Sequence, residues 1–184
     1  QFFDQLSFHG LVGYTIPQGK LFKADDGKKL SGGGINVDLD ILYHFDQLDY
    51  KLGVGVSYNG SFLFAADFED MFSIGLYGLD IYGVKGYYRF FDSNISPYAS
   101  LTVGVSQFST PKLEVVVDGS ESYEIIPSQS SFGLGLRPEI GVELGGFNIS
   151  AAYVVPMNYK LFDEKRSAGG FQISIGYRYT LFDW

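Results

Sequence analysis

Residues 35–45, INVDLDILYHF, alternate in polarity, and this period-two pattern constrains the fold more than any other feature of the chain. Apolar side chains occupy every second position, and most of the side chains between them are polar: Asn36, Asp38, Asp40 and His44. Successive side chains of a β-strand point to opposite faces, so the pattern predicts a strand with two unlike faces. A soluble barrel would bury the apolar face, whereas a barrel in an outer membrane would turn it towards lipid.

Seven further segments of the chain show similar alternation. With the first one they cover residues 6–16, 35–45, 50–58, 74–90, 99–105, 132–144, 147–157 and 171–181. The fourth segment is the least regular. Leu79 and Ile81 fall out of phase with Tyr82, and a bulge near Ile81 would restore the register. Bulges are also expected at Pro138 and Pro156, since proline cannot donate a hydrogen bond to a strand ladder.

Short and long connections alternate between these segments. Short turns lie at 46–49, 92–96 and 145–146, and long polar loops at about 17–33, 60–72, 109–131 and 158–169. This order predicts an all-β fold with one domain over residues 1–184: an eight-stranded antiparallel up-and-down barrel with both chain ends at its short-turn end. The predicted partners at the turns are all apolar: Phe45 with Tyr50, Phe90 with Ala99, and Leu144 with Phe147.

The composition excludes several other classes of protein. No apolar run approaches the roughly 20 residues that a membrane helix needs. A barrel strand needs only about 10 residues with every other one apolar, so a membrane barrel is compatible with the mean hydropathy of +0.06. The chain has no cysteine, which excludes disulfide and thiolate chemistry, and its net charge of -8 argues against nucleic-acid binding.

The distribution of charge over the two faces indicates which face is enclosed. The polar face of the strands carries five bases and five acids. They are Lys51, Lys85, Arg89, Arg137 and Arg178, and Asp38, Asp40, Glu139, Glu143 and, less regularly placed, Asp80. Buried ions are costly unless paired, so this balance favours a lumen charge network. A salt-bridged solvent face is the alternative, but such faces carry dense Lys and Glu rather than Gly, Ser, Thr and Asn.

Aromatic residues on the apolar face form two groups. Near the short turns these are Tyr43, Phe45, Tyr50, Tyr88, Phe90 and Phe147, and near the long loops Tyr14, Tyr58, Phe132 and Phe171. Val, Leu and Ile lie between the groups, as in the two aromatic girdles that flank the lipid-facing band of a transmembrane barrel.

On these features the whole chain resembles the small eight-stranded outer-membrane barrels of Gram-negative bacteria, the OmpA, OmpX and OmpW-like group. Its last strand is similar to the assembly signal of such barrels, with alternating Ser174, Gly176, Tyr179 and Leu181. The resemblance implies insertion by the barrel-assembly machinery, contact with outer-membrane lipid and lipopolysaccharide, and periplasmic N- and C-termini.

Candidate catalytic residues are few. Ser7 and His9 lie two apart on one strand and could form a nucleophile and base, but hydrogen bonding within the lumen is the favoured interpretation. Asp38 and Asp40 could bind a metal or act as acid and base, but ion pairing with lumen Arg and Lys is favoured. We expect no metal or cofactor.

The loops offer candidate contact surfaces. Lys20, Lys23, Lys28 and Lys29 could contact lipopolysaccharide phosphates, but a solvated loop is the favoured interpretation. The loop at 109–131 contains KLEVVVDG and YEII, which could extend a hairpin whose strand edges bind a partner protein.

The function that follows is that of a non-enzymatic surface barrel with a plugged lumen and loops that make contacts. A narrow channel for small or hydrophobic solutes, as the OmpW-like resemblance allows, is the alternative. A lipid A-modifying enzyme is a third reading.

Overall fold

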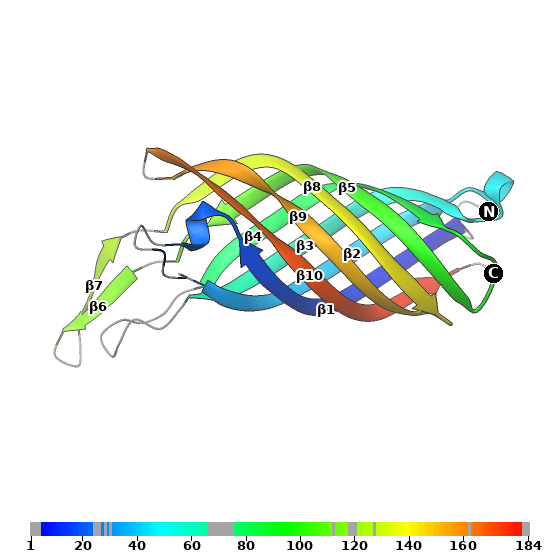
Figure 1. Ribbon diagram of the computed structural model, residues 1–184, viewed down its shortest axis with the longest axis horizontal. Helices are drawn as coiled ribbons and strands as arrows, with labels where there is room; N and C mark the ends of the chain where they lie inside the picture. The colour runs from blue at the N-terminus through cyan, green and yellow to red at the C-terminus, as the bar shows by residue number, and fades with distance from the viewer. Residues whose placement is uncertain are drawn as a thin grey trace.

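The computed structural model describes residues 5–23, 27, 29, 31–65, 76–111, 113–117, 121–126, 128–161 and 163–181. In this part of the chain, eight strands close into an antiparallel barrel in the order β1-β10-β9-β8-β5-β4-β3-β2 (Figure 1). The predicted eight-stranded up-and-down barrel is therefore confirmed. No helix among the described residues has the length and apolar character needed to span a membrane.

The barrel strands are long, with 13 to 17 residues each. They are β1 (Leu6–Gln18), β2 (Ser31–His44), β3 (Leu52–Ala65), β4 (Leu76–Arg89), β5 (Ile95–Ser109), β8 (Ser130–Leu144), β9 (Phe147–Leu161) and β10 (Glu164–Thr180). Two 3-10 turns, η2 (Lys20–Phe22) and η3 (Asp46–Leu48), follow β1 and β2.

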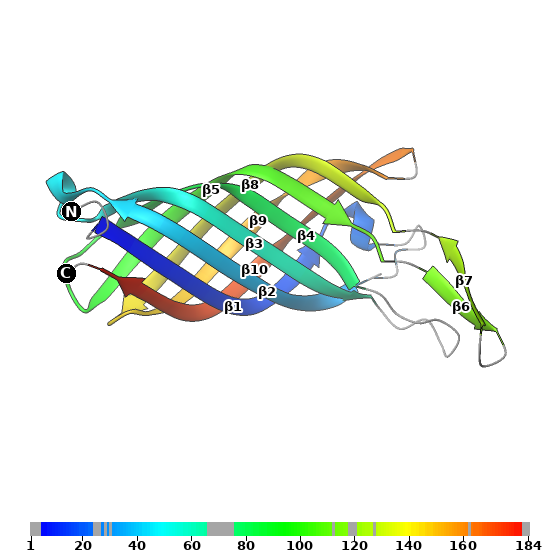
Figure 2. The ribbon, with the colours of Figure 1, turned by 180° about the vertical axis from the view of Figure 1, so that it is seen from behind.

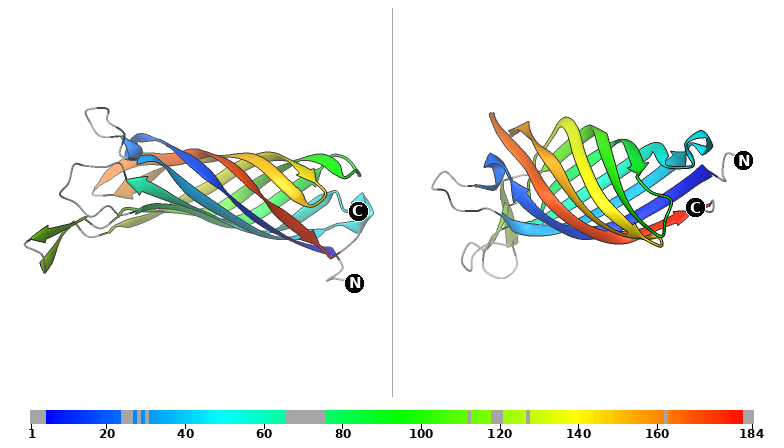
Figure 3. Two further views of the ribbon diagram at one scale, coloured as in Figure 1. Left: turned by 90° about the horizontal axis from the view of Figure 1, so that it is seen from below. Right: turned by 45° about the vertical axis from the view of Figure 1, so that its right-hand side comes forward.

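A separate two-stranded sheet is made by β6 (Leu113–Val117) and β7 (Glu121–Ile126). It lies beyond the barrel wall at the end with the long connections (Figure 2). The hairpin predicted within the loop at 109–131 is therefore present. At the opposite end, Ser7 of β1 pairs with Thr180 of β10, so the first and last strands close the barrel beside the short turns (Figure 3).

The short turns set the register of neighbouring strands. Leu144 pairs with Phe147, as predicted. The hydrogen bonds of the other two turns join Phe45 to Leu52 and Phe90 to Pro97, so both predicted partners were wrong by two residues. The β2–β3 connection is longer than predicted because η3 and two left-handed residues take up chain. A two-residue shift leaves every side chain on the same face, so the predicted faces survive the error.

The predicted bulges are only partly present. No register shift occurs near Ile81, where β4 pairs regularly with both neighbours, so that prediction was wrong. The β9–β10 ladder shifts between Ala168 and Gly170, opposite the segment that contains Pro156, as expected. Pro138 pairs in register with β5 without a bulge, but the β8–β9 ladder begins only at the next residue, Glu139.

The two faces of each strand differ sharply in exposure. On β5, Leu101, Val103 and Val105 are 44–52 % exposed, whereas Thr102 and Ser106 are each 1 % exposed. The apolar face is thus the outer wall and the polar face lines the lumen. An apolar outer wall is what a lipid environment requires of a barrel, since water would make such a surface unfavourable.

Candidate functional site in the barrel lumen

Three layers of side chains fill the lumen. The charged layer extends from mid-barrel to the short turns and consists of Asp38, Asp40, Lys85, Arg89, Arg137, Glu139, Glu143 and Arg178. The neutral layer lies next to the charged layer, on the side of the loop end. It consists of Thr15, Asn36, Asn59, Ser61, Gln172 and Ser174. The apolar layer lies at the loop end and consists of Phe22, Leu63, Leu79, Ile81, Phe108, Val154, Tyr159, Leu161 and Ala168.

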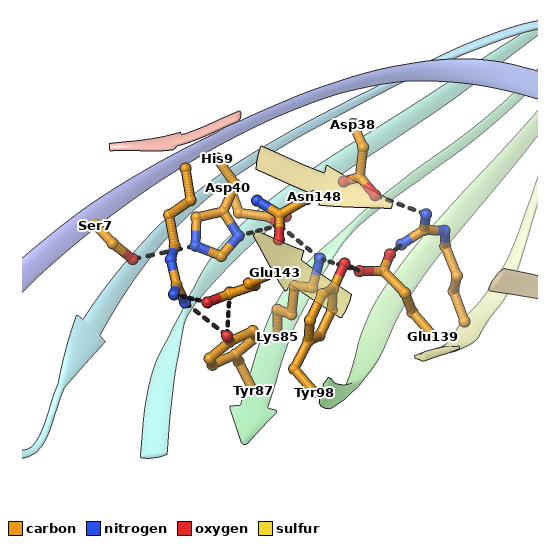
Figure 4. Close-up of polar contacts among 12 residues, drawn as sticks. Ser7, His9, Asp38, Asp40, Lys85, Tyr87, Tyr98, Glu139, Glu143 and Asn148 are labelled. Atoms are coloured by element: carbon orange, nitrogen blue, oxygen red, sulfur yellow. Dashed lines mark hydrogen bonds and ion pairs between the residues drawn. The ribbon is translucent and has the colours of Figure 1, made fainter. Parts of the chain in front are cut away.

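The upper half of the charged layer is a group of five side chains from three parts of the sequence (Figure 4). Nη2 of Arg137 lies 2.6 Å from Oδ2 of Asp38, and its Nη1 donates a 2.6 Å hydrogen bond to Glu139. Nζ of Lys85 donates to Asp40 at 2.5 Å and lies 3.6 Å from Glu139. Each base thus lies beside two carboxylates, and this pairing offsets part of the cost of burying the five ions.

The lower half of the charged layer is centred on Glu143. Tyr87 and Arg178 both donate hydrogen bonds to its carboxylate (Figure 4). Nε of Arg89 lies 3.3 Å from the same carboxylate. The guanidinium carbon of Arg178 also lies 5.1 Å from the centroid of the Tyr87 ring, within cation–π range. Tyr87 therefore joins a charged pair to the aromatic side chains that pack beside it.

Small residues make room for the large ones. A Cβ atom at Gly141 would lie 2.5 Å from the ring of Tyr98, whose hydroxyl donates to Glu139 at 3.0 Å. A side chain at that position would push the ring and break the hydrogen bond. In the narrow interior of an eight-stranded barrel, the missing side chain of Gly141 thus provides the space that the Tyr98 ring occupies.

The two histidines lie beside the charged layer. A hydrogen bond of 2.7 Å joins Oγ of Ser7 to Nε2 of His44, and another of 3.3 Å joins it to Nε2 of His9. Nδ1 of His9 lies 3.6 Å from Asp40. The order Ser7, His9, Asp40 matches that of a hydrolase triad, but Ser7 is fully buried and shared between two imidazoles. These contacts support the structural interpretation of all three side chains.

Two residues expected in the lumen lie elsewhere. Lys51 precedes β3 in a turn, where its Nζ lies 2.9 Å from Asp92 and its side chain is 24 % exposed. A hydrogen bond to the Asp92 carboxylate raises the pKa of Lys51 above its ordinary value. Asp80 lies on the outer wall, where it pairs with Gly60 and accepts a 2.9 Å hydrogen bond from Tyr58.

These two displacements have identifiable causes. The longer β2–β3 connection keeps Lys51 at the rim, and the absence of a bulge at Ile81 turns Asp80 outwards. Because one base and one acid leave the lumen together, the charged layer among the described residues holds four bases and four acids. The predicted charge balance of the lumen therefore still applies.

The neutral layer connects the other two by hydrogen bonds. Arg137 donates to Oε1 of Gln172 at 2.8 Å, and Nε2 of Gln172 donates to both Asn59 and Ser61 at 2.9 Å. Ser174 donates to Asn36 at 2.9 Å. The hydrogen-bond network of the charged layer thus extends towards the loop end through uncharged donors and acceptors. Burying these groups does not carry the cost of removing an ion from water.

Sequence analysis missed the apolar layer. The ring of Phe22, from η2, lies 5.6 Å from Phe108 and 6.0 Å from Tyr77 in edge-to-face contacts. Its side chain enters the barrel from the loop after β1, and it is 3 % exposed. A signal was present in the sequence, since Leu63 and Leu79 both occupy the inward phase of their strands near the loop end.

The remaining predicted site residues lie in the loop after β1 and in or just after the last strand. Lys20, Lys23 and Lys29 are exposed at the loop end, and Lys28 lies outside the described residues. In the last strand, Ser174 is buried and Tyr179 faces outwards at 58 % exposure. Leu181 follows the strand and is also exposed, and Gly176 packs against the backbone of β1. Within the described ranges, no cluster of His, Asp or Glu has the arrangement of a metal site.

Comparisons with known proteins bear on the fold. No protein-family model matches the chain, and no curated protein matches it. Among solved structures it is similar to Ail, the attachment invasion locus protein of Yersinia pestis, with a TM-score of 0.54 and 21% identity over 94% of this chain and 98% of that one. Ail in complex with the heparin analogue sucrose octasulfate gives 0.52 and 20% over 95% and 99%.

A second protein gives the same result. Neisserial surface protein A is similar with a TM-score of 0.53 and 16% identity, over 95% of this chain and 96% of that chain. At such low identity these likenesses bear on the fold alone. Together with the closed eight-stranded meander, they show that this chain has the fold of the small eight-stranded outer-membrane β-barrels.

Proposed function

We propose that the chain is an integral outer-membrane barrel that acts without catalysis, with a closed lumen and with its contacts at the loop end. The observation that carries the proposal is the charged layer, whose eight residues are at most 3 % exposed and contact one another. An ion that entered this layer would have to separate buried ion pairs, which is strongly unfavourable. The lumen therefore serves as a rigid support for the loops.

Planar-bilayer recording tests the closed lumen. The purified barrel should give no stable single-channel steps in salt solution. Replacing Arg137 with Ala removes the largest fully buried side chain of the layer, and this variant should conduct if it still folds. Stable steps from the unaltered barrel would contradict the proposal, and Lys51→Ala at the rim provides a control that should behave like the unaltered protein.

The loop end carries a basic group that favours contact with lipopolysaccharide phosphates. Its lysines are exposed, whereas Arg166 is partly buried, and Lys160 and Arg166 are paired with Asp163 and Glu164. Its members come from two connections: Lys20, Lys23 and Lys29 after β1, and Lys160, Lys165 and Arg166 around the β9–β10 turn. The two connections meet, because the backbone N–H of Lys20 donates to Oγ of Ser167 at 3.2 Å. Ail binds a sulfated sugar in its crystal structure. We propose that this basic group binds clustered phosphates by attraction between cations and a polyanion.

Binding to lipopolysaccharide micelles at low salt tests this surface. The triple variant Lys20→Ala/Lys23→Ala/Lys165→Ala should bind about a hundredfold more weakly, since each base near an anionic surface contributes about 1 kcal/mol. Added salt should reduce the difference because it screens exposed charges. Equal affinity of the triple variant and the unaltered barrel would contradict the proposed contact, and Lys51→Ala is the matched control at the opposite end.

Passage of a hydrophobic solute is the second candidate function, and the apolar layer favours it. The loop end of the lumen is lined by aliphatic and aromatic side chains and closed by Phe22. The β8–β9 ladder covers only Glu139–Leu144 with Phe147–Ala152, so the wall beside this layer has few ladder hydrogen bonds. Transport of a fluorescent fatty acid into liposomes, faster in Phe22→Ala than in the unaltered barrel, would favour this function over a closed lumen.

A further inference from the structure

A carboxylate lies within the apolar surface of the outer wall. Asp80 points outwards from β4, between Leu76 on the loop side and Tyr82 and Val84 on the side of the short turns. These three neighbours are 49–58 % exposed. Among the described residues, no lysine or arginine pairs with Asp80, and its hydrogen-bond donor is the uncharged Tyr58 hydroxyl. A charge among lipid-facing side chains is costly, so such a residue is a candidate for binding a partner.

Two glycines leave the carboxylate of Asp80 accessible. Gly60 pairs with Asp80 across the β3–β4 ladder, and Gly78 lies two positions away on β4. A Cβ atom at Gly78 would lie 3.7 Å from Oδ2 of Asp80, so the absence of a side chain there leaves space beside this oxygen. The Tyr58 hydroxyl donates to the other oxygen, Oδ1, at 2.9 Å. Within the described part of the chain, Oδ2 therefore remains open to a further donor.

An apolar groove begins beside this carboxylate and crosses β1, β2, β3 and β4. It has a volume of about 550 Å³, within the range of ligand sites. Its outward-facing lining residues are Phe8, Leu39, Ile41, Val56, Tyr58 and Tyr82. The rings of Tyr58 and Tyr82 lie 5.0 Å apart at the end next to Asp80. Phe8 and Ile41 pair with each other near the short turns, at the other end. Tyr58 thus joins the groove to the carboxylate.

We propose that this site binds an amphiphile in which a protonated amine is joined to a hydrocarbon chain. The ammonium group donates to Oδ2 of Asp80, and the chain lies in the groove. Charge complementarity selects this head, because a cation neutralises the carboxylate where the dielectric constant is low, whereas an anionic head is repelled. The inference rests on the proposed membrane location, and it is independent of the closed lumen and of the loop contacts.

The test is a titration of the full, folded chain in dodecyl maltoside micelles at pH 7, where an amine is protonated as a lysine side chain is. Amide chemical shifts of Tyr58, Gly60 and Asp80 are followed while decylammonium is added. Parallel series use decanol, which lacks the charge, and ethylammonium, which lacks the long chain. The proposal predicts saturable shifts with decylammonium and affinities at least about tenfold weaker for both other probes.

Two pairs of variants separate recognition from folding. Asp80→Asn keeps an acceptor for Tyr58 but removes the charge, and it should weaken decylammonium binding about tenfold. Asp92→Asn, at the short-turn rim, is the matched control and should bind as the unaltered chain does. Gly78→Val fills the space beside Oδ2 and should also weaken binding. Gly86→Val adds the same side chain on the same face of β4, away from the groove, and should not.

Three outcomes would overturn the proposal. They are the absence of saturable shifts with decylammonium, equal affinity of Asp80→Asn and Asp92→Asn, and decanol binding as tight as that of decylammonium. A dimer that forms in the micelles and requires Asp80 would assign the groove to a second copy of the chain, and would overturn it too. Nuclear Overhauser effects between Val84 and the detergent chains in the same sample test the lipid-facing wall separately, so failure of the amine site is distinguishable from failure of the membrane location.

Discussion

The charged layer and the apolar layer occupy the same lumen and are buried to the same extent, but they hold the barrel together in different ways. In the charged layer, Arg137 and Lys85 each contact two carboxylates at defined distances. In the apolar layer, side chains such as Leu79 and Phe108 are held by packing alone, and Phe22 reaches them from a loop. Side chains buried in the lumen of one barrel can therefore be held either by ion pairs or by apolar packing.

The difference has a mechanical consequence. Ion pairs lose most of their stabilisation when one partner leaves, whereas an apolar group can repack when one member withdraws. The charged layer should therefore behave as a fixed plug, and the apolar layer as the part of the lumen that can open. The predictions that follow test this contrast in order of decreasing effect.

Removing one partner of the charged layer should have the largest effect. In Arg137→Met, the carboxylates of Asp38 and Glu139 lose their shared base, and the free energy of unfolding should fall by about 3–5 kcal/mol. Urea unfolding in lipid vesicles measures the change. The double variant Arg137→Met/Asp38→Asn should recover part of the loss. A loss below that of the apolar variant described next would contradict the contrast between the layers.

Truncating the apolar layer should have a smaller effect. Phe22→Ala removes a buried ring, and the free energy of unfolding should fall by about 2 kcal/mol, because the loop that carries the ring can retract and limit the cavity. The same urea measurement applies, with the outward-facing Phe62→Ala as the control for lost lipid contact. A loss equal to that of Arg137→Met would show that the apolar layer is as rigid as the charged one.

A polar contact on the outer wall should matter less than either layer. Tyr58→Phe deletes the hydrogen bond to Asp80, and the free energy of unfolding should fall by about 1 kcal/mol. Asp80→Asn offers a comparison that keeps an acceptor for the tyrosine. If Tyr58→Phe were as harmful as Arg137→Met, the assignment of Asp80 to the wall rather than to the lumen would be wrong.

The ion pair at the rim should have the smallest effect. Lys51→Ala should leave the urea midpoint unchanged at neutral pH, since exposed pairs contribute little. The pKa of Lys51 is raised by Asp92, so any contribution of this pair is complete below the ordinary value of 10.5 and is lost as pH rises through the raised pKa. A titration of the Lys51 ammonium by NMR should show this higher pKa, and Asp92→Asn should return it towards 10.5.

The sequence predicted the charged layer and missed the apolar one for a physical reason. Alternation identifies a face by the polarity of its residues, so Asp38 and Arg137 were assigned to the lumen without difficulty. Leu79 and Ile81 were expected to point outwards after a bulge, because apolar residues were assigned to the outer face. Where the lumen itself is lined by apolar side chains, this assignment fails. The inward phase of Leu63 and Leu79 was a signal of an apolar lumen, but it does not show which side chains meet there. Contacts between distant segments, such as Phe22 with Phe108, show that.

The position of Lys51 could not be predicted from the sequence because it depends on the geometry of a turn. The position of Lys51 depends on how many residues the turn after β2 consumes, and this depends on η3 and on left-handed backbone that no alternation encodes. The group of side chains around Glu143 combines residues that are distant in sequence, from β4, β8 and β10. Pairing across a barrel must be known before such a site can be recognised.

The central claim is that the apolar half of each strand meets acyl chains while the charged layer lies inside the barrel. The most direct test is to measure nuclear Overhauser effects between lipid methylene protons and the methyl groups of the unaltered barrel in nanodiscs. We predict strong effects at Val84, Leu101 and Val103 and none at Leu42, Leu63 and Leu79, which are buried in the lumen. Strong effects at the second group and none at the first would contradict the account.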